Sequence, residues 1–187
     1  ILALGTYLPK LTTIITLPIL TGYLTKAEYG SYDLITTLVS LLLPAMTLQI
    51  QSAAFRFLIS SRDNEKEITS VVTNIFSFTV PVSCIGLLIT YFALGDSIDP
   101  LTKKLILLYF FSDIIYIGCG QITRGIGRNA IYASGAVVVS VVNMIGIVLS
   151  MLVFEAGLNG IAIGMLAGCV IGSALMFVRV RIFHYFD

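Results

Sequence analysis

Charged residues are scarce in this chain of 187 residues: they make up 11% of it, whereas soluble domains carry about a quarter. Apolar residues make up 57%. Because so few charges cannot keep a folded surface in water, the composition excludes an ordinary soluble domain and predicts a protein embedded in a membrane. The formal net charge of +1 gives no indication of a nucleic-acid partner.

Histidine and cysteine are also rare, and tryptophan is absent. His184 is the only histidine, so zinc or triad chemistry built on histidine lacks a partner residue. The three cysteines, Cys84, Cys119 and Cys169, lie far apart in apolar runs and are expected to be small packing residues. The chain also lacks the Gly-Lys-Ser/Thr loop that cradles phosphate in ATPases. We therefore expect no metal, no other cofactor and no enzymatic activity.

Long apolar runs fill most of the sequence. Each is close to the ~20 residues that a helix needs to cross the hydrocarbon core of a bilayer, and the connections between the runs are short and polar. We predict an all-α membrane protein whose six transmembrane helices form one lobe without a soluble domain. The predicted spans cover residues 2–24, 28–57, 68–94, 102–123, 130–154 and 158–180.

Basic residues are distributed unevenly between the two sides of this lobe. Those near the second and fourth connections and the end of the chain are Arg56, Arg62, Lys66, Arg124, Arg128, Arg179 and Arg181, whereas the opposite side has Lys26, Lys103 and Lys104. Since cytoplasmic loops are enriched in Lys and Arg, we predict that both ends of this chain lie in the cytoplasm.

Polar side chains recur at helical spacing on several spans. The series are Asp33, Thr37, Ser40, Pro44, Thr47 and Gln51; Tyr109, Asp113, Tyr116, Gly120 and Arg124; Ser70, Thr73, Asn74, Ser77 and Pro81; Ser140, Asn143 and Ser150; and Thr6, Lys10, Thr13 and Pro18. For any one of these residues, a hydrogen bond between helices is the better explanation. Whole stripes on several helices predict either a shared, water-accessible cavity or an interior dense with hydrogen bonds, and we favour the cavity.

The last predicted span carries a glycine at every fourth position: Gly160, Gly164, Gly168 and Gly172. A groove of small residues lets another helix approach closely. These glycines therefore predict a tight helix–helix contact, which is a structural role.

Three charged side chains fall inside predicted spans. At 1.5 Å per residue, Lys10 lies about 21 Å from the outer end of its span, Asp113 about 15 Å and Asp33 about 8 Å. Lys10 either pairs with Asp113 or provides an anion site in the cavity. Asp33 is either a carboxylate favoured by a helix N-terminus or a cation or proton site.

Two carboxylates offer one enzymatic alternative. Asp33 in a Tyr-Asp pair and Asp96 in a Leu-Gly-Asp stretch superficially resemble the paired motifs of intramembrane aspartyl proteases, in which two carboxylates share a proton and activate water. Ala93 stands where that motif needs a glycine. This interpretation is therefore a remote alternative.

Three stretches carry a resemblance to a known family. They are residues 5–10 (Gly-Thr-Tyr-Leu-Pro-Lys), followed by Leu17-Pro18 and residues 23–33; residues 121–133; and residues 157–160 (Gly-Leu-Asn-Gly), which follow Asn143. With these stretches the chain resembles the N-terminal lobe of Wzx-type polysaccharide (O-antigen) flippases. Those flippases belong to the multidrug/oligosaccharidyl-lipid/polysaccharide exporter superfamily.

The resemblance implies a protein of two helical lobes around a central cavity, with the C-terminal lobe absent from this chain. It implies alternating access and the transport of undecaprenyl-diphosphate-linked oligosaccharide to the outer leaflet of a prokaryotic cytoplasmic membrane, for cell-surface polysaccharide synthesis. The polysaccharide polymerase machinery is a further implied partner. Within the superfamily, the alternative is a proton- or sodium-coupled multidrug exporter.

The resemblance and the polar stripes together give a set of candidate site residues. By position, Lys10 is a candidate contact for the diphosphate, with Arg56 and Arg124 as further candidates at the cytoplasmic mouth. Gln51, Asn74 and Asn143 are candidate cavity residues from the polar stripes. Asp33 and Asp113 are candidate coupling or gating acids, with a proton or sodium as the coupling ion.

Overall fold

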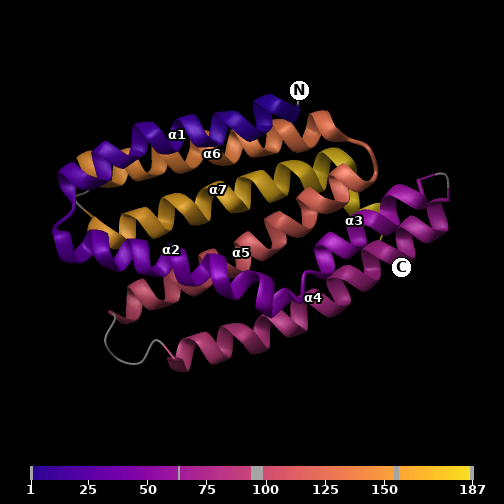
Figure 1. Cartoon of the computed structure of the whole chain (residues 1–187), viewed down its shortest axis with the longest axis horizontal. Coiled ribbons are helices and arrows are strands. Elements are labelled where there is room, and N and C mark those ends of the chain that lie inside the picture. Colours follow the sequence, from indigo (N-terminus) through magenta and orange to yellow (C-terminus); the bar gives the residue numbers. More distant parts are fainter. Residues whose placement is uncertain (1, 63, 94–98, 154–155, 186–187) are drawn as a thin grey trace.

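The computed structural model describes residues 2–62, 64–93, 99–153 and 156–185 (Figure 1). This part of the chain forms seven α-helices, one short 3-10 helix and no strand, which confirms the all-α class. The α-helices are α1 (Leu2–Tyr23), α2 (Lys26–Thr47), α3 (Ile50–Ser60), α4 (Glu65–Ala93), α5 (Pro100–Gly125), α6 (Asn129–Leu152) and α7 (Gly157–Val180), and the 3-10 helix is η1 (Ile182–Tyr185).

Local side-chain chemistry sets where two of the helices begin. Thr25 caps α2: its hydroxyl accepts from the Glu28 backbone N–H at 3.3 Å, and the Glu28 carboxylate accepts from the Thr25 N–H at 2.9 Å. This reciprocal pair is a capping box. Asp99 caps α5 by accepting from the backbone N–H groups of Leu101 and Thr102, and Pro100 occupies the first helical position.

Four helices of the described chain, α4, α5, α6 and α7, are each long and apolar enough to cross a membrane. The pair α2 and α3 supplies a fifth crossing if the two form one bent span. The protein is therefore a multi-pass membrane protein. A count of six spans stays a prediction, because it also requires a crossing at residues 2–24, which fold as α1.

The structure divides the predicted span 28–57 into two helices. Leu48 and Gln49 have φ angles of 48° and 54°, and the axes of α2 and α3 are bent by 57° (Figure 1). The left-handed conformation of Leu48 ends α2. Pro44 lies inside the last turn of α2 and has no N–H to donate, which weakens the helix there. The polar stripe from Asp33 to Gln51 is therefore not one continuous face.

Helix α7 lies between α5 and α6, and α1 packs on α6 (Figure 1). The predicted glycine contact is confirmed, because a Cβ on Gly146 of α6 would lie 2.7 Å from the Cα of Gly164 on α7. A Cβ on Gly164 would lie 2.9 Å from the backbone nitrogen of Ile147. Glycine is thus required for the two backbones to touch.

The connections of the bundle gather at its two ends. Figure 1 shows the α3–α4 and α5–α6 connections near the end of η1, with the α1–α2 turn at the far end of the bundle. Arg62, which follows α3, donates to the carbonyl oxygens of Gly125 and Arg124 at the end of α5, at 2.7 and 3.3 Å. The arrangement agrees with the predicted grouping of the connections; which end faces the cytoplasm stays a prediction.

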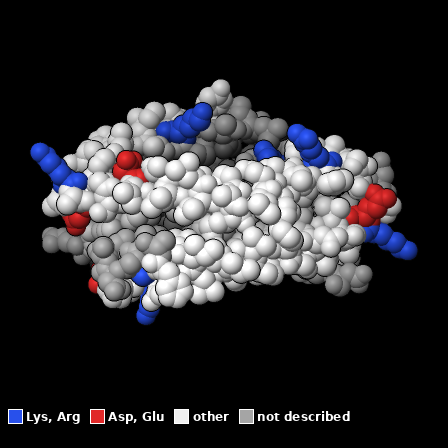
Figure 2. Space-filling model, turned by 60° about the horizontal axis from the view of Figure 1, so that its bottom comes forward, with Lys and Arg blue, Asp and Glu red and all other residues white. Residues whose placement is uncertain are grey.

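Charged side chains leave a wide part of one face of the bundle free. On the face shown in Figure 2, the Lys, Arg, Asp and Glu side chains of the described residues lie mainly toward the two ends and along the upper edge. The wide area between them is uncharged. Such a belt suits the hydrocarbon core of a bilayer.

Candidate functional site

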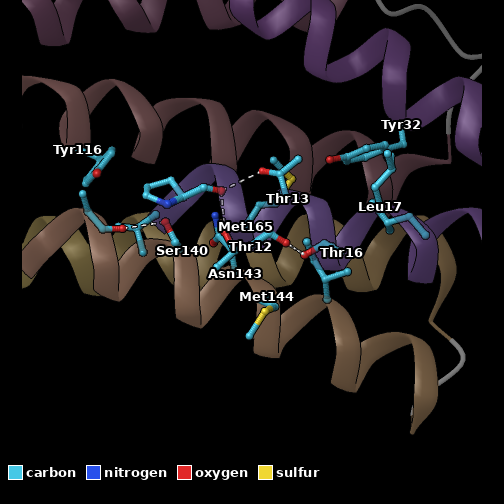
Figure 3. Close-up of a pocket in the computed structure, with 15 residues that line it drawn as sticks. Thr12, Thr13, Thr16, Leu17, Tyr32, Tyr116, Ser140, Asn143, Met144 and Met165 are labelled. Atoms are coloured by element: carbon cyan, nitrogen blue, oxygen red, sulfur yellow. Dashed lines mark hydrogen bonds between the residues drawn. The ribbon is translucent and has the colours of Figure 1, made fainter. Parts of the chain in front are cut away.

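The clearest internal site is a cavity of about 340 Å³ between α1 and α6 (Figure 3). Residues from Pro9 to Leu20 on α1 and from Ala136 to Ile147 on α6 form its two long walls. Tyr32 of α2, Tyr116 of α5 and Met165 of α7 complete it. Five helices thus contribute to one cavity. Of the predicted stripe residues only Thr13, Tyr116, Ser140 and Asn143 line it, and the stripe on α4 contributes none.

Three threonines line the α1 wall, and each donates its hydroxyl hydrogen to its own helix. Thr12 and Thr13 both donate to the carbonyl oxygen of Pro9, at 2.8 and 3.0 Å, and Thr16 donates to that of Thr12 at 2.7 Å. A hydroxyl has one hydrogen and two acceptor lone pairs. The threonine oxygens therefore remain available as hydrogen-bond acceptors along the cavity wall.

Two tyrosines mark the ends of the cavity. Figure 3 shows Tyr116 on one side and Tyr32 on the other, with the threonines and Asn143 between them. Both tyrosines are half-buried. None of the described residues that line the cavity carries a charge. Lone pairs and aromatic faces suit a ligand that brings its own hydrogen-bond donors, such as one rich in hydroxyl groups, better than an anion.

Asn143 lies in this cavity, as the candidate list placed it. Its amide fits an orientation in which the nitrogen donates to the backbone oxygens of Gly164 and Met165 on α7, at 3.0 and 3.3 Å. A Cβ on Gly168 would overlap the Asn143 side chain. Asn143 therefore joins α6 to α7 in addition to facing the cavity.

Lys10 and Asp113 do not meet. Lys10 is exposed on α1, next to the cavity residue Pro9, and its Nζ lies 5.9 Å from the centre of the Tyr7 ring. Asp113 on α5 is partly buried and accepts from the thiol of Cys169 on α7 at 3.7 Å. Among the described residues no ion pair joins Lys10 to Asp113, because α1 packs on α6 instead of α5. The structure therefore overturns the ion-pair alternative.

Arg124 and Gln51 lie away from the cavity, where α3 packs on α5. The Arg124 guanidinium lies 5.0 Å from the Phe55 ring and 4.9 Å from the Tyr132 ring, and it donates to the Gln121 side chain. Its Nε is buried and has no hydrogen-bond partner. Gln51 is 2% exposed, and its Nε2 also lacks a partner.

The remaining candidates are spread over other surfaces. Asp33 is exposed on α2 and Arg56 is exposed on α3. Asn74 lines a separate polar groove of about 870 Å³, which α4 and η1 form with Lys66 and His184 among its residues. Asp96, the second acid of the protease alternative, lies outside the described residues.

The sequence did not single out Thr12 or Thr16 as cavity residues, and it treated Tyr32 only as a neighbour of Asp33. The signal that points to them is the recurrence of threonine at positions 12, 13 and 16, which places three hydroxyls on adjoining faces of one helix. In the described part of the chain, no three His, Cys, Asp or Glu side chains converge in a way that would hold a metal ion.

Apolar helices around an uncharged cavity, in which threonine, tyrosine, serine and asparagine side chains alternate with aliphatic ones, define a multi-pass helical membrane protein. Over residues 1–187 the chain matches the family described as polysaccharide biosynthesis protein, and it belongs to that family. Membership indicates a flippase- or transporter-type role in polysaccharide biosynthesis. No curated protein and no solved structure matches the chain.

Proposed function

We propose that this protein is a flippase of the Wzx type, which moves an undecaprenyl-diphosphate-linked oligosaccharide to the outer leaflet of a prokaryotic cytoplasmic membrane by alternating access. The observation that carries the proposal is the uncharged cavity between α1 and α6, with acceptor oxygens on one wall and a tyrosine at each end. Family membership agrees with a role in polysaccharide biosynthesis.

The chemistry of the cavity fits the head of such a substrate. A sugar hydroxyl that enters hydrocarbon without a hydrogen bond costs roughly 2–7 kcal/mol, depending on the reference state. Thr12, Thr13 and Thr16 offer oxygens that can accept from sugar hydroxyls during transit. The faces of Tyr32 and Tyr116 can pack against the apolar C–H face of a sugar ring.

The diphosphate requires positive charge, which this cavity lacks. We assign that role to Lys10, which is exposed one residue beyond Pro9 on the cavity helix, with Arg56 as a further contact. An exposed ammonium in a membrane span costs about 2.5–3.5 kcal/mol on insertion scales. We therefore propose that Lys10 and Asp33 face a polar space shared with a second lobe, and that Asp33 takes part in coupling or gating.

The test is flipping by the intact protein in sealed vesicles. Undecaprenyl-diphosphate-linked glycan is placed in one leaflet, and its exposure to a glycan-modifying reagent is followed on the other side. We expect the wild type to flip the glycan, Lys10→Ala to slow flipping about tenfold or more through loss of the phosphate contact, and Asp33→Asn to alter its dependence on the ion gradient.

Matched amounts of folded protein are required for each variant. A wild type that moves no lipid-linked glycan would overturn the proposal. If it instead exported organic cations in response to a proton or sodium gradient, the multidrug-exporter alternative would replace it.

A further inference from the structure

The break between α2 and α3 is built from residues that disfavour it. Leu48 and Gln49 adopt consecutive left-handed conformations, with φ of 48° and 54°. Residues with a side chain rarely take this conformation, because Cβ approaches the next carbonyl oxygen. Glycine, which would relieve the strain, stands at neither position. Leu48 is 66% exposed, so no burial of its own side chain holds the conformation in place.

The two arms of the break are held by different partners. At the end of α2, the Met46 side chain fills the space beside Gly86 of α4. On α3, Leu58 packs against Gly125 of α5, where a Cβ would lie 2.7 Å from that of Leu58. The bend is therefore held by packing at both arms, against the local preference of Leu48 and Gln49.

Buried polar groups without a hydrogen-bond partner lie on α3 and on the helix that faces it. Gln51, in the first turn of α3, buries an Nε2 without a partner, and the buried Nε of Arg124 on the facing helix α5 lacks one as well. Native structures leave few such groups. A strained backbone two residues from the unpartnered donor of Gln51 points to a segment with a second arrangement, because strain of this kind gathers at switch regions.

We propose that α3 is a moving arm that swings about Leu48 and Gln49, and that the bent form is one end of its motion. At the other end, residues 26–60 form a straighter helix, in which both hinge residues take the right-handed conformation. The purpose of the motion rests on the proposed function, since alternating access needs two packings of similar energy. The hinge itself does not depend on the identity of the cargo.

The experiment measures a distance along the bent pair. Spin labels are placed at Gly30→Cys and Ser60→Cys in a Cys84→Ser background, because all three positions are exposed and a Cβ at Gly30 meets nothing within 4 Å. At 1.5 Å per residue the labelled backbone positions are about 45 Å apart in a straight helix and about 40 Å apart across a bend of 57°. Pulsed electron spin resonance in bilayers separates these distances.

The variants change only the backbone preference at the hinge. Leu48→Gly with Gln49→Gly favours the left-handed conformation, and Leu48→Ile disfavours it because β-branched residues avoid positive φ. We expect the wild type to show both distances, the glycine pair to shift the ratio at least fivefold toward 40 Å, and Leu48→Ile to shift it by a similar factor toward 45 Å. Leu41→Ile is the matched control, since Leu41 is equally exposed within α2, and it should shift nothing.

One distance near 40 Å in all four proteins would overturn the hinge and show a rigid kink. A shift by Leu41→Ile as large as that by Leu48→Ile would also overturn it, because the effect would then not come from the hinge backbone. The measurement needs no substrate, so it separates failure of the hinge from failure of the flippase proposal.

Discussion

The Nε of Arg62 lies 2.7 Å from the carbonyl oxygen of Gly125, so the connection after α3 closes the C-terminal end of α5. A second bond from the same guanidinium reaches the carbonyl oxygen of Arg124 at 3.3 Å. The last carbonyl groups of a helix have no partner within it. Arg62 thus satisfies the carbonyl oxygen of Gly125, adds a second bond to that of Arg124, which also accepts from the Gly127 N–H, and ties together two connections that are far apart in sequence.

Replacing Arg62 by alanine should lower the free energy of unfolding by about 1 kcal/mol, because two charge-assisted bonds are lost at a partly solvated site. Arg62→Lys should restore only part of this, since an ammonium lacks the planar fork of a guanidinium. The resistance of each purified variant to thermal unfolding in detergent is measured and compared with that of the wild type. Arg128→Ala, another exposed arginine at the same end, is the control, and an equal loss from it would contradict the capping role.

Gly164→Ala should destabilise the protein by about 1–3 kcal/mol, because overpacking at a backbone contact forces the helices apart. The added Cβ would lie 2.9 Å from the Ile147 nitrogen. Gly118→Ala is the matched change in α5, where a Cβ meets nothing within 4 Å. It should be neutral or stabilising by up to about 1 kcal/mol, through helix propensity alone. The same heat-resistance assay compares the two, and equal behaviour would contradict the close contact.

Thr13→Val should slow glycan flipping about two- to tenfold, which corresponds to one hydrogen bond worth about 0.5–1.5 kcal/mol. The change keeps the shape of the side chain and removes the oxygen that faces the cavity. Thr21, on the same helix, is not among the residues that line the cavity, and Thr21→Val removes a hydroxyl that bonds only to the backbone oxygens of Leu17 and Pro18. Initial rates in the vesicle assay provide the comparison; equal slowing by both variants would argue for a general effect on α1.

Gln51→Met should raise the free energy of unfolding by about 1 kcal/mol or more, because it removes a buried donor without a partner and keeps a side chain of similar volume. Gln121→Met should have the opposite sign, since it takes away the acceptor of the Arg124 guanidinium. Denaturation in detergent measures both. A loss of stability from Gln51→Met would mean that its amide finds a partner such as bound water.

The sequence predicted the helical class and the close contact at Gly164 because spacing along one helix is a local property. It also placed Asn143 on a polar face that does line the cavity. It did not predict the break at Leu48 and Gln49, since neither residue is a helix breaker and the bend is imposed by packing at Met46 and Leu58.

The depth of a residue along a helix can be calculated from the sequence, but the helices that pack against it cannot. Lys10 and Asp113 were expected at similar depth, and that estimate carried no information on which helices pack together. In the structure α1 packs on α6, and Asp113 contacts Cys169 of α7. Thr12 and Thr16 were missed for a related reason, since only the packing of α1 on α6 shows which side chains of α1 face the cavity, whereas Thr13 was already part of a predicted polar face.

The threonine wall has a consequence for selectivity. The three threonine hydroxyls already donate their hydrogens to backbone carbonyl oxygens, so they can only accept hydrogen bonds from a ligand. Such a surface favours molecules that bring their own hydrogen-bond donors, and it disfavours anions. A pocket lined in this way can accept hydrogen bonds from the hydroxyl groups of many different sugars, so discrimination among them would have to come from contacts outside the pocket.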